Sequence, residues 1–108
     1  MKVNIKGTKI KLTPQIKEHV QEKMDMLEKY LGKIQVLHCD VELSREKVTQ
    51  NNGEIYRAEV NLELPQEMLR IEKTEDDLIK ALEKVKDHLA RSIKKYKERK
   101  IDKKTKIV

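Results

Sequence analysis

LHCDVELS, residues 37–44, and YRAEVNLEL, residues 56–64, alternate apolar and polar side chains along their whole length. A period of two is typical of a strand that buries one face of a sheet and leaves the other in water. The segment Gln50-Asn51-Asn52-Gly53 between them is a turn signal, and Pro65 ends the second strand. The pair therefore predicts two neighbouring strands, each with one apolar face.

Shorter segments on either side extend this sheet. Val3 and Ile5 alternate with polar residues before Gly7, which predicts a short first strand that stops at the glycine. Leu69 and Ile71 predict a short fourth strand whose polar neighbours face away. A sheet of four strands is thus expected.

One helix is expected between the first two strands. Thr13 and Pro14 mark its start, because Thr is a good N-cap and Pro is tolerated at the first helical position. An apolar stripe with three- and four-residue steps then predicts a single helix that ends near Gly32. The stripe consists of Ile16, Val20, Met24, Leu27 and Leu31.

A second, longer helix should follow the fourth strand. Thr74 with Asp77 three residues later resembles a capping box at its start. A second apolar stripe predicts a helix that ends near Ile101, which makes residues 1–101 one domain and residues 102–108 a basic tail or linker stub. This stripe consists of Ile79, Leu82, Val85, Leu89, Ile93 and Tyr96.

The element order β-α-β-β-β-α predicts an α+β fold, with a four-stranded sheet and two helices packed on one face. The other sheet face should be wet and net acidic, because it carries five acids and two Arg. Its expected residues are His38, Asp40, Glu42, Arg57, Glu59, Asn61, Glu63, Arg70 and Glu72.

The composition limits the class of protein. The 108 residues are 37% apolar and 41% charged, and their periodic apolar stretches argue against wholesale disorder. Cys39 is the single cysteine, so an intramolecular disulfide framework is excluded. The sequence holds neither an apolar run of about 20 residues nor a signal-peptide core after Met1. We expect a cytoplasmic protein with no membrane partner.

The last helix carries an excess of base. From Lys80 to Lys106 there are twelve Lys/Arg against four acids, a local net of +8 that exceeds the whole-chain net of +6. One or two cations would complement the helix dipole, so the rest need another reason. A repetitive anion such as a phosphate backbone is the simplest partner, and a merely soluble basic protein is the alternative.

The first helix offers a second row of base. Lys17, Lys23 and Lys29 lie away from its apolar stripe. If the two helices lie side by side on the sheet, they form a basic strip together. The second helix contributes Lys80, Lys84, Arg91, Lys94, Lys95 and Arg99 to it.

Other chemistries find little support. The expected outward sheet positions carry no aromatic residue, which argues against base stacking of the RNA-recognition-motif kind. Tyr30 and Tyr96 fit core packing better than base stacking. Cys39 is expected to be a buried thiol rather than a nucleophile, and the three histidines lie on different elements. We expect no catalytic residue, no metal, no cofactor and no small-molecule substrate, and therefore no enzyme.

An ordered series of short segments carries a family resemblance. The segments are NIKG (4–7), LT (12–13), IK (16–17), LEKY (27–30), LP (64–65), LRIE (69–72), LARSI (89–93) and KYK (95–97). At this spacing, over about residues 1–101, the chain resembles the ribosome hibernation-promoting factor / ribosome-associated inhibitor family, also called the sigma-54 modulation protein family. Leu78-Ile79 and Met26 depart from the family pattern, the latter at a position that is often basic.

The resemblance implies a stress-response protein that binds the decoding region of the small (30S) ribosomal subunit, with 16S rRNA as partner. There it would block mRNA and the A- and P-site tRNAs sterically. It also implies a short form or the N-terminal domain of a longer protein, with the ribosome-dimerising C-terminal domain absent from this chain. The rRNA contacts that it implies are Lys17, Lys23, Arg91, Lys95, Lys97 and Arg99; charge alone adds Lys84 and Lys94.

A protein-interaction module is the main alternative to this function. In that case the acidic sheet face would bind a basic partner, such as a sigma factor. An RNA-processing enzyme would need a catalytic constellation that the sequence lacks. Charge reversals distinguish rRNA binding from protein binding, because rRNA binding depends on the bases of the helices and protein binding on the acids of the sheet face.

Overall fold

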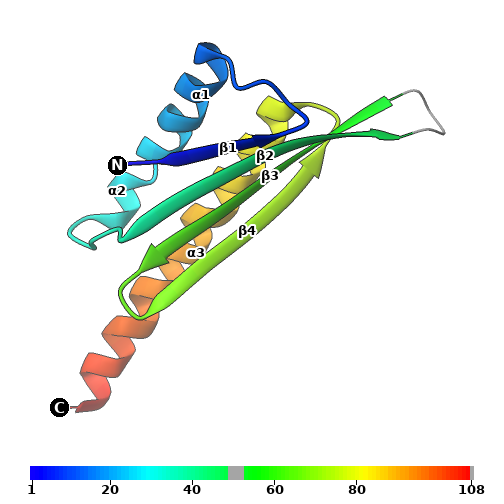
Figure 1. Ribbon diagram of the computed structural model, residues 1–108. Helices are drawn as coiled ribbons and strands as arrows, with labels where there is room; N and C mark the ends of the chain where they lie inside the picture. The colour runs from blue at the N-terminus through cyan, green and yellow to red at the C-terminus, as the bar shows by residue number, and fades with distance from the viewer. Residues whose placement is uncertain (49–52, 108) are drawn as a thin grey trace.

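The computed structural model describes residues 1–48 and 53–107, with side chains for residues 1–47 and 53–100. The elements are β1 (Asn4–Thr8), α1 (Pro14–Asp25), α2 (Glu28–Leu31), β2 (His38–Val48), β3 (Gly53–Leu64), β4 (Glu67–Glu75) and α3 (Leu78–Ile107). The sheet order is β1-β2-β3-β4, with β1 parallel to β2 and the other neighbours antiparallel. All helices lie on one face of the sheet (Figure 1), which confirms the predicted α+β architecture.

The two central strands bury the side chains that the alternation selects. Cys39, Val41 and Leu43 on β2 are at most 2% exposed, and Val60 and Leu62 on β3 are fully buried. Val41 lies opposite Val60, and this register continues the apolar face across the sheet. The predicted turn at residues 50–53 lies outside the described residues except for Gly53, which begins β3.

Two details of the strand prediction are wrong. Leu37 was expected on the buried row, but it precedes β2 and is 43% exposed. Gly7 does not end β1, which runs on to Thr8. A Cβ on Gly7 would lie 2.9 Å from the Ile10 carbonyl oxygen and 2.9 Å from a Leu12 side-chain carbon. The glycine is therefore needed because the following loop packs directly against the strand.

The predicted first helix is divided into two. Thr13 caps α1 as expected, because its hydroxyl accepts a hydrogen bond from the Ile16 amide at 3.2 Å. α1 ends at Asp25. Just beyond it, the Leu27 amide donates a hydrogen bond to the Met24 carbonyl at 3.0 Å, which closes a tighter turn than the α-helical one. The apolar stripe still reaches Leu31, so the break changes the path of the helix but not its buried face.

α3 begins later than the predicted capping box. Thr74 lies in β4 opposite Arg57, and the cap is the Asp77 carboxylate, which accepts from the Ile79 amide at 2.9 Å. Leu78 occupies the core at 8% exposure, whereas Ile79, predicted as core, is 37% exposed. The α3 backbone continues to Ile107, beyond the predicted end near Ile101.

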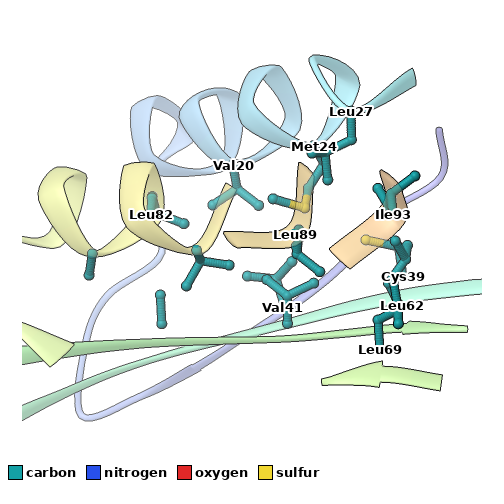
Figure 2. Packing of buried hydrophobic residues seen from close by; sticks show 14 of the residues in the cluster. Val20, Met24, Leu27, Cys39, Val41, Leu62, Leu69, Leu82, Leu89 and Ile93 are labelled. Carbon is teal, nitrogen blue, oxygen red and sulfur yellow. The ribbon is translucent and has the colours of Figure 1, made fainter. Parts of the chain in front are cut away.

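An aliphatic core joins the helices to the sheet. Figure 2 shows Met24 of α1 reaching toward Leu89 of α3, which points in turn toward Val41 of the sheet. Met24 and Leu89 are fully buried. Tyr96 is 2% exposed and donates its hydroxyl proton to the Pro65 carbonyl at 2.8 Å, so it packs in the core as predicted. α3 is thereby fixed at a defined rotation, and its remaining face is presented to solvent.

Candidate nucleic-acid interface

The outer sheet face, opposite the helices, is a layer of paired acids and bases. Arg57 on β3 donates to the Glu72 carboxylate on β4 at 2.6 and 2.9 Å, and it also bonds Glu59. These contacts raise the pKa of Arg57 and lower the pKa of Glu72. Across the four strands, Lys6, Glu42, Glu59 and Glu72 stand in one row. The face is rich in carboxylates, and a phosphate backbone would meet repulsion there.

A basic stripe runs along α3 on the side next to β4. Its members recur at three- and four-residue steps, which places them on one face of the helix. They are Lys84, His88, Arg91, Lys95 and Arg99. Contacts of the two ends fix the direction of the stripe, because Lys84 pairs with Glu75 and Arg99 with Glu67, both on β4.

Arg91 and Lys95 form the open centre of this stripe. Both side chains are exposed, and neither has an ion-pair partner within residues 1–47 and 53–100. A guanidinium and an ammonium one helical turn apart can each contact one phosphate. Among the eight predicted contacts, these two are best placed to bind a polyanion directly.

Lys84 and Arg99 are exposed but paired. Their side chains are 59% and 54% exposed in ion pairs with Glu75 and Glu67. Exposed pairs of this kind contribute about 0–1 kcal/mol, so both cations can exchange a carboxylate for a phosphate at small cost. They extend the stripe as weaker contacts.

Lys23 and Lys97 hold the helices together instead. Lys23 of α1 pairs with Glu83 of α3, and its side chain is only 17% exposed. Lys97 of α3 donates to the Tyr30 carbonyl oxygen of α2 at 2.8 Å. That carbonyl lies in the last turn of α2, where backbone acceptors lack helical partners. Both lysines were predicted as RNA contacts, yet their ammonium groups are directed at protein atoms.

Lys17 and Lys94 lie apart from the stripe. Lys17 is exposed on α1. Lys94 is also exposed, and its ammonium lies 5.2 Å from the centre of the Tyr30 ring, with Lys29 at 5.1 Å on the same ring. The two ammonium groups above Tyr30 make a second, smaller basic area between α2 and α3. The structure therefore distributes the predicted strip over two areas.

Two basic neighbours were missed by the sequence reasoning. His88 occupies the middle of the stripe, and burial together with the charges of Lys73, Arg91 and Lys95 lowers its pKa. Lys73 comes from β4, so a strand as well as a helix contributes to the cluster. The spacing Lys84-His88-Arg91 could have identified His88, whereas no sequence signal predicts that Lys73 lies beside it.

The described part of the chain offers little else that suggests chemistry. Cys39 is fully buried, and burial raises the pKa of its thiol to about 12, as expected for a structural cysteine. Over the same residues, no group of three or more His, Cys, Asp or Glu side chains is placed to hold a metal ion. No helix in the described ranges is long and apolar enough to span a bilayer.

Comparison with known proteins gives one family and a consistent set of folds. Residues 3–101 match the family described as Sigma 54 modulation protein / S30EA ribosomal protein. The Thermus thermophilus Protein Y N-terminal domain is 25% identical, with a TM-score of 0.73 over 86% of this chain and 94% of that domain. A ribosomal subunit interface protein from Coxiella burnetii has the same fold, with 17% identity and a TM-score of 0.76 over 91% of this chain and 99% of the other.

Proposed function

Because the chain belongs to the Sigma 54 modulation protein / S30EA ribosomal protein family, we propose that it binds the ribosome and represses translation. The proposed target is the rRNA of the small subunit in its decoding region. The protein contributes no reaction chemistry in this function. It acts by occupying the space that mRNA and tRNA need.

The observation that carries this proposal is a pair of cations at the centre of the α3 stripe that have no ion-pair partner within the described side chains. Arg91 and Lys95 face solvent on the helical side, while the carboxylates gather on the opposite sheet face. A molecule with charge divided in this way docks on a polyanion in one orientation, because the reverse orientation brings carboxylates against phosphates. Phosphate contacts fix position and register without the need to recognise base sequence.

Steric occlusion follows from how the domain would be held. A sheet covered on one face by helices cannot share a channel with a second polymer once its helical face is fixed to the channel wall. The described α3, 30 residues long, would provide the contact surface, since Leu89 and Ile93 on its other side are buried in the core and fix its orientation. The structure of the protein need not change on binding in this mechanism.

Co-sedimentation with isolated subunits tests the proposal. We expect the native chain to pellet with 30S and not with 50S subunits, and to compete with tRNA and mRNA for them. The double variant Arg91→Glu/Lys95→Glu should stay in the supernatant, because reversal puts two acids where phosphates must lie. The variant Lys2→Glu/Lys33→Glu is the control, with the same charge change at exposed lysines away from α3.

The acidic sheet face gives a second candidate function, in which the face binds a basic protein. Glu42 and Glu63 lie on this face with no helix above them. Under this hypothesis, Glu42→Lys/Glu63→Lys should abolish partner binding while Arg91→Glu/Lys95→Glu leaves it intact. Retained 30S binding by the helix variant, with loss in the sheet variant, would reject the rRNA-binding mechanism.

A further inference from the structure

The centre of the α3 stripe contains a histidine surrounded by cations. The charged groups that shift the pKa of His88 are Lys73 on β4 and Arg91 and Lys95 on α3. None of these groups is a carboxylate. Glu75 of β4, two residues after Lys73, is paired with Lys84, and Asp87 of α3 is paired with Lys86. Within the described residues, the cluster thus consists of three permanent cations around one titratable ring, and no carboxylate shifts the pKa of that ring.

The ring itself is incompletely bonded. His88 is half-buried, and its Nδ1 is enclosed without a hydrogen-bond partner among the described residues. A buried polar atom in this state costs free energy unless a ligand or another group completes it. On the exposed side of the ring, an anion is the chemical class that the surrounding charges favour.

We propose that Lys73, His88, Arg91 and Lys95 form one binding site for the phosphate backbone of RNA, and that His88 takes up a proton from solvent when the backbone binds. This inference rests on the proposed function and identifies a specific site within it. The ligand is a short run of phosphodiesters of the RNA backbone, contacted by a β4 lysine as well as by α3. The histidine makes the affinity of the site depend on pH.

The direction of the pH effect follows from the electrostatics. In the free protein, burial and the three cations keep the pKa of His88 below its usual value, so the ring is neutral at neutral pH. A bound phosphate adds a negative charge beside the ring and favours the imidazolium form. Since the complex then holds a proton that the free protein lacks, binding strengthens as the pH falls. A rise of one pKa unit on binding corresponds to at most about tenfold in affinity, a limit that is approached only at a pH below both pKa values.

Variants of His88 separate the protonation effect from the packing effect. Affinity for 30S subunits is measured at about pH 8 and about pH 6, across the range in which a histidine changes charge. We expect the native chain to bind tighter at the lower pH by a factor of up to about ten, after its pH ratio is divided by the ratio found for His88→Gln. His88→Lys should bind tightly at both values because its charge is permanent. His19→Gln and His38→Gln are controls at exposed histidines and should keep the native ratio.

A direct titration makes the inference independent of the ribosome. The pKa of His88 is followed by NMR of its ring protons, with and without a short double-stranded RNA. A rise with RNA, reduced in Lys73→Gln but not in Lys33→Gln, supports the site. An unchanged pKa, or an equal pH ratio in the native chain and His88→Gln, overturns it. If the pKa rises with RNA while 30S subunits are not bound at either pH, the site stands and the ribosomal target fails.

Discussion

Removing the two central cations of the stripe should change the salt dependence of ribosome binding by a calculable amount. In Arg91→Gln/Lys95→Gln, each substitution removes one exposed cation that has no ion-pair partner within the described residues. A cation that neutralises one phosphate releases counterions, and contributes about 0.7 to 0.9 to the slope of log affinity against log salt. The double variant should therefore bind with a slope shallower by about 1.4 to 1.8.

The same slope sets the loss of affinity. Taken over one decade of salt, from about 1 M down to about 0.1 M, a slope change of this size makes binding by the variant about 25- to 60-fold weaker than native binding. This loss corresponds to about 2 to 2.5 kcal/mol. Neutral glutamines are used because they remove attraction without adding repulsion. Both positions are exposed on the solvent side of α3, so the free energy of unfolding should change by less than about 0.5 kcal/mol.

Equilibrium binding to fluorescently labelled 30S subunits at several salt concentrations measures both quantities. The matched control is Lys2→Gln/Lys33→Gln, which lowers the net charge equally at exposed lysines outside the helices. The control should keep the native slope. An unchanged slope in the stripe variant would refute direct phosphate contact by Arg91 and Lys95. Equal changes in both variants would mean that net charge, and not the stripe, determines binding.

Three further predictions concern single residues. Lys97→Gln should lower the free energy of unfolding in urea by about 1 to 2 kcal/mol, because it loses a charged hydrogen bond to the Tyr30 carbonyl. Lys94→Gln should change the free energy of unfolding little. Both variants should keep the native salt slope of ribosome binding. Cys39, with its thiol pKa raised to about 12, should react with a maleimide at about pH 8 only after unfolding; rapid native labelling would contradict its burial. Because the pKa of His88 is lower in the folded than in the unfolded chain, stability should fall as the pH drops through about 6.5, and His88→Gln should flatten that part of a thermal-denaturation profile.

The sequence predicts the extent of a strand only where one of its faces packs against the helices. Val60 and Leu62 have buried positions on alternate residues, so the pattern is visible in the sequence. β4 was expected to be short, because its later inward positions hold Lys73 and Glu75, which break the alternation. These residues extend past the apolar core, and backbone pairing with β3 keeps them in the strand. Pairing of this kind leaves no trace in hydropathy.

The helix starts show a similar limit. Thr74 and Asp77 are both good N-cap residues, and local propensity does not choose between them. The choice falls to Asp77 because Thr74 is paired with Arg57 in the sheet. The buried residue in the first turn of α3 is Leu78, whereas Ile79 is exposed. Long-range pairing thus decided a detail that appeared to be local.

The basic side was predictable as a region but not residue by residue. A count of charges cannot distinguish Lys95, which is exposed, from Lys97, which reaches the Tyr30 carbonyl, although they are two positions apart. The distinction depends on the rotation of α3 about its axis, which the core residues fix. The opposite error occurred at His88, which a count of formal charges omits although it lies inside the cluster.

These differences suggest an order in which the cations would act on RNA. Arg91 and Lys95 need give up no partner among the described residues and should dominate affinity. Lys84 and Arg99 are exposed cations that must first leave half-buried carboxylates, an exchange that costs about 1 kcal/mol and offsets much of one phosphate contact. Lys23 would lose a half-buried ion pair between α1 and α3, so its replacement should weaken the fold before it weakens binding. A ranking of single glutamine variants by salt slope and by stability would therefore separate the three classes, whereas their sequence positions alone would not.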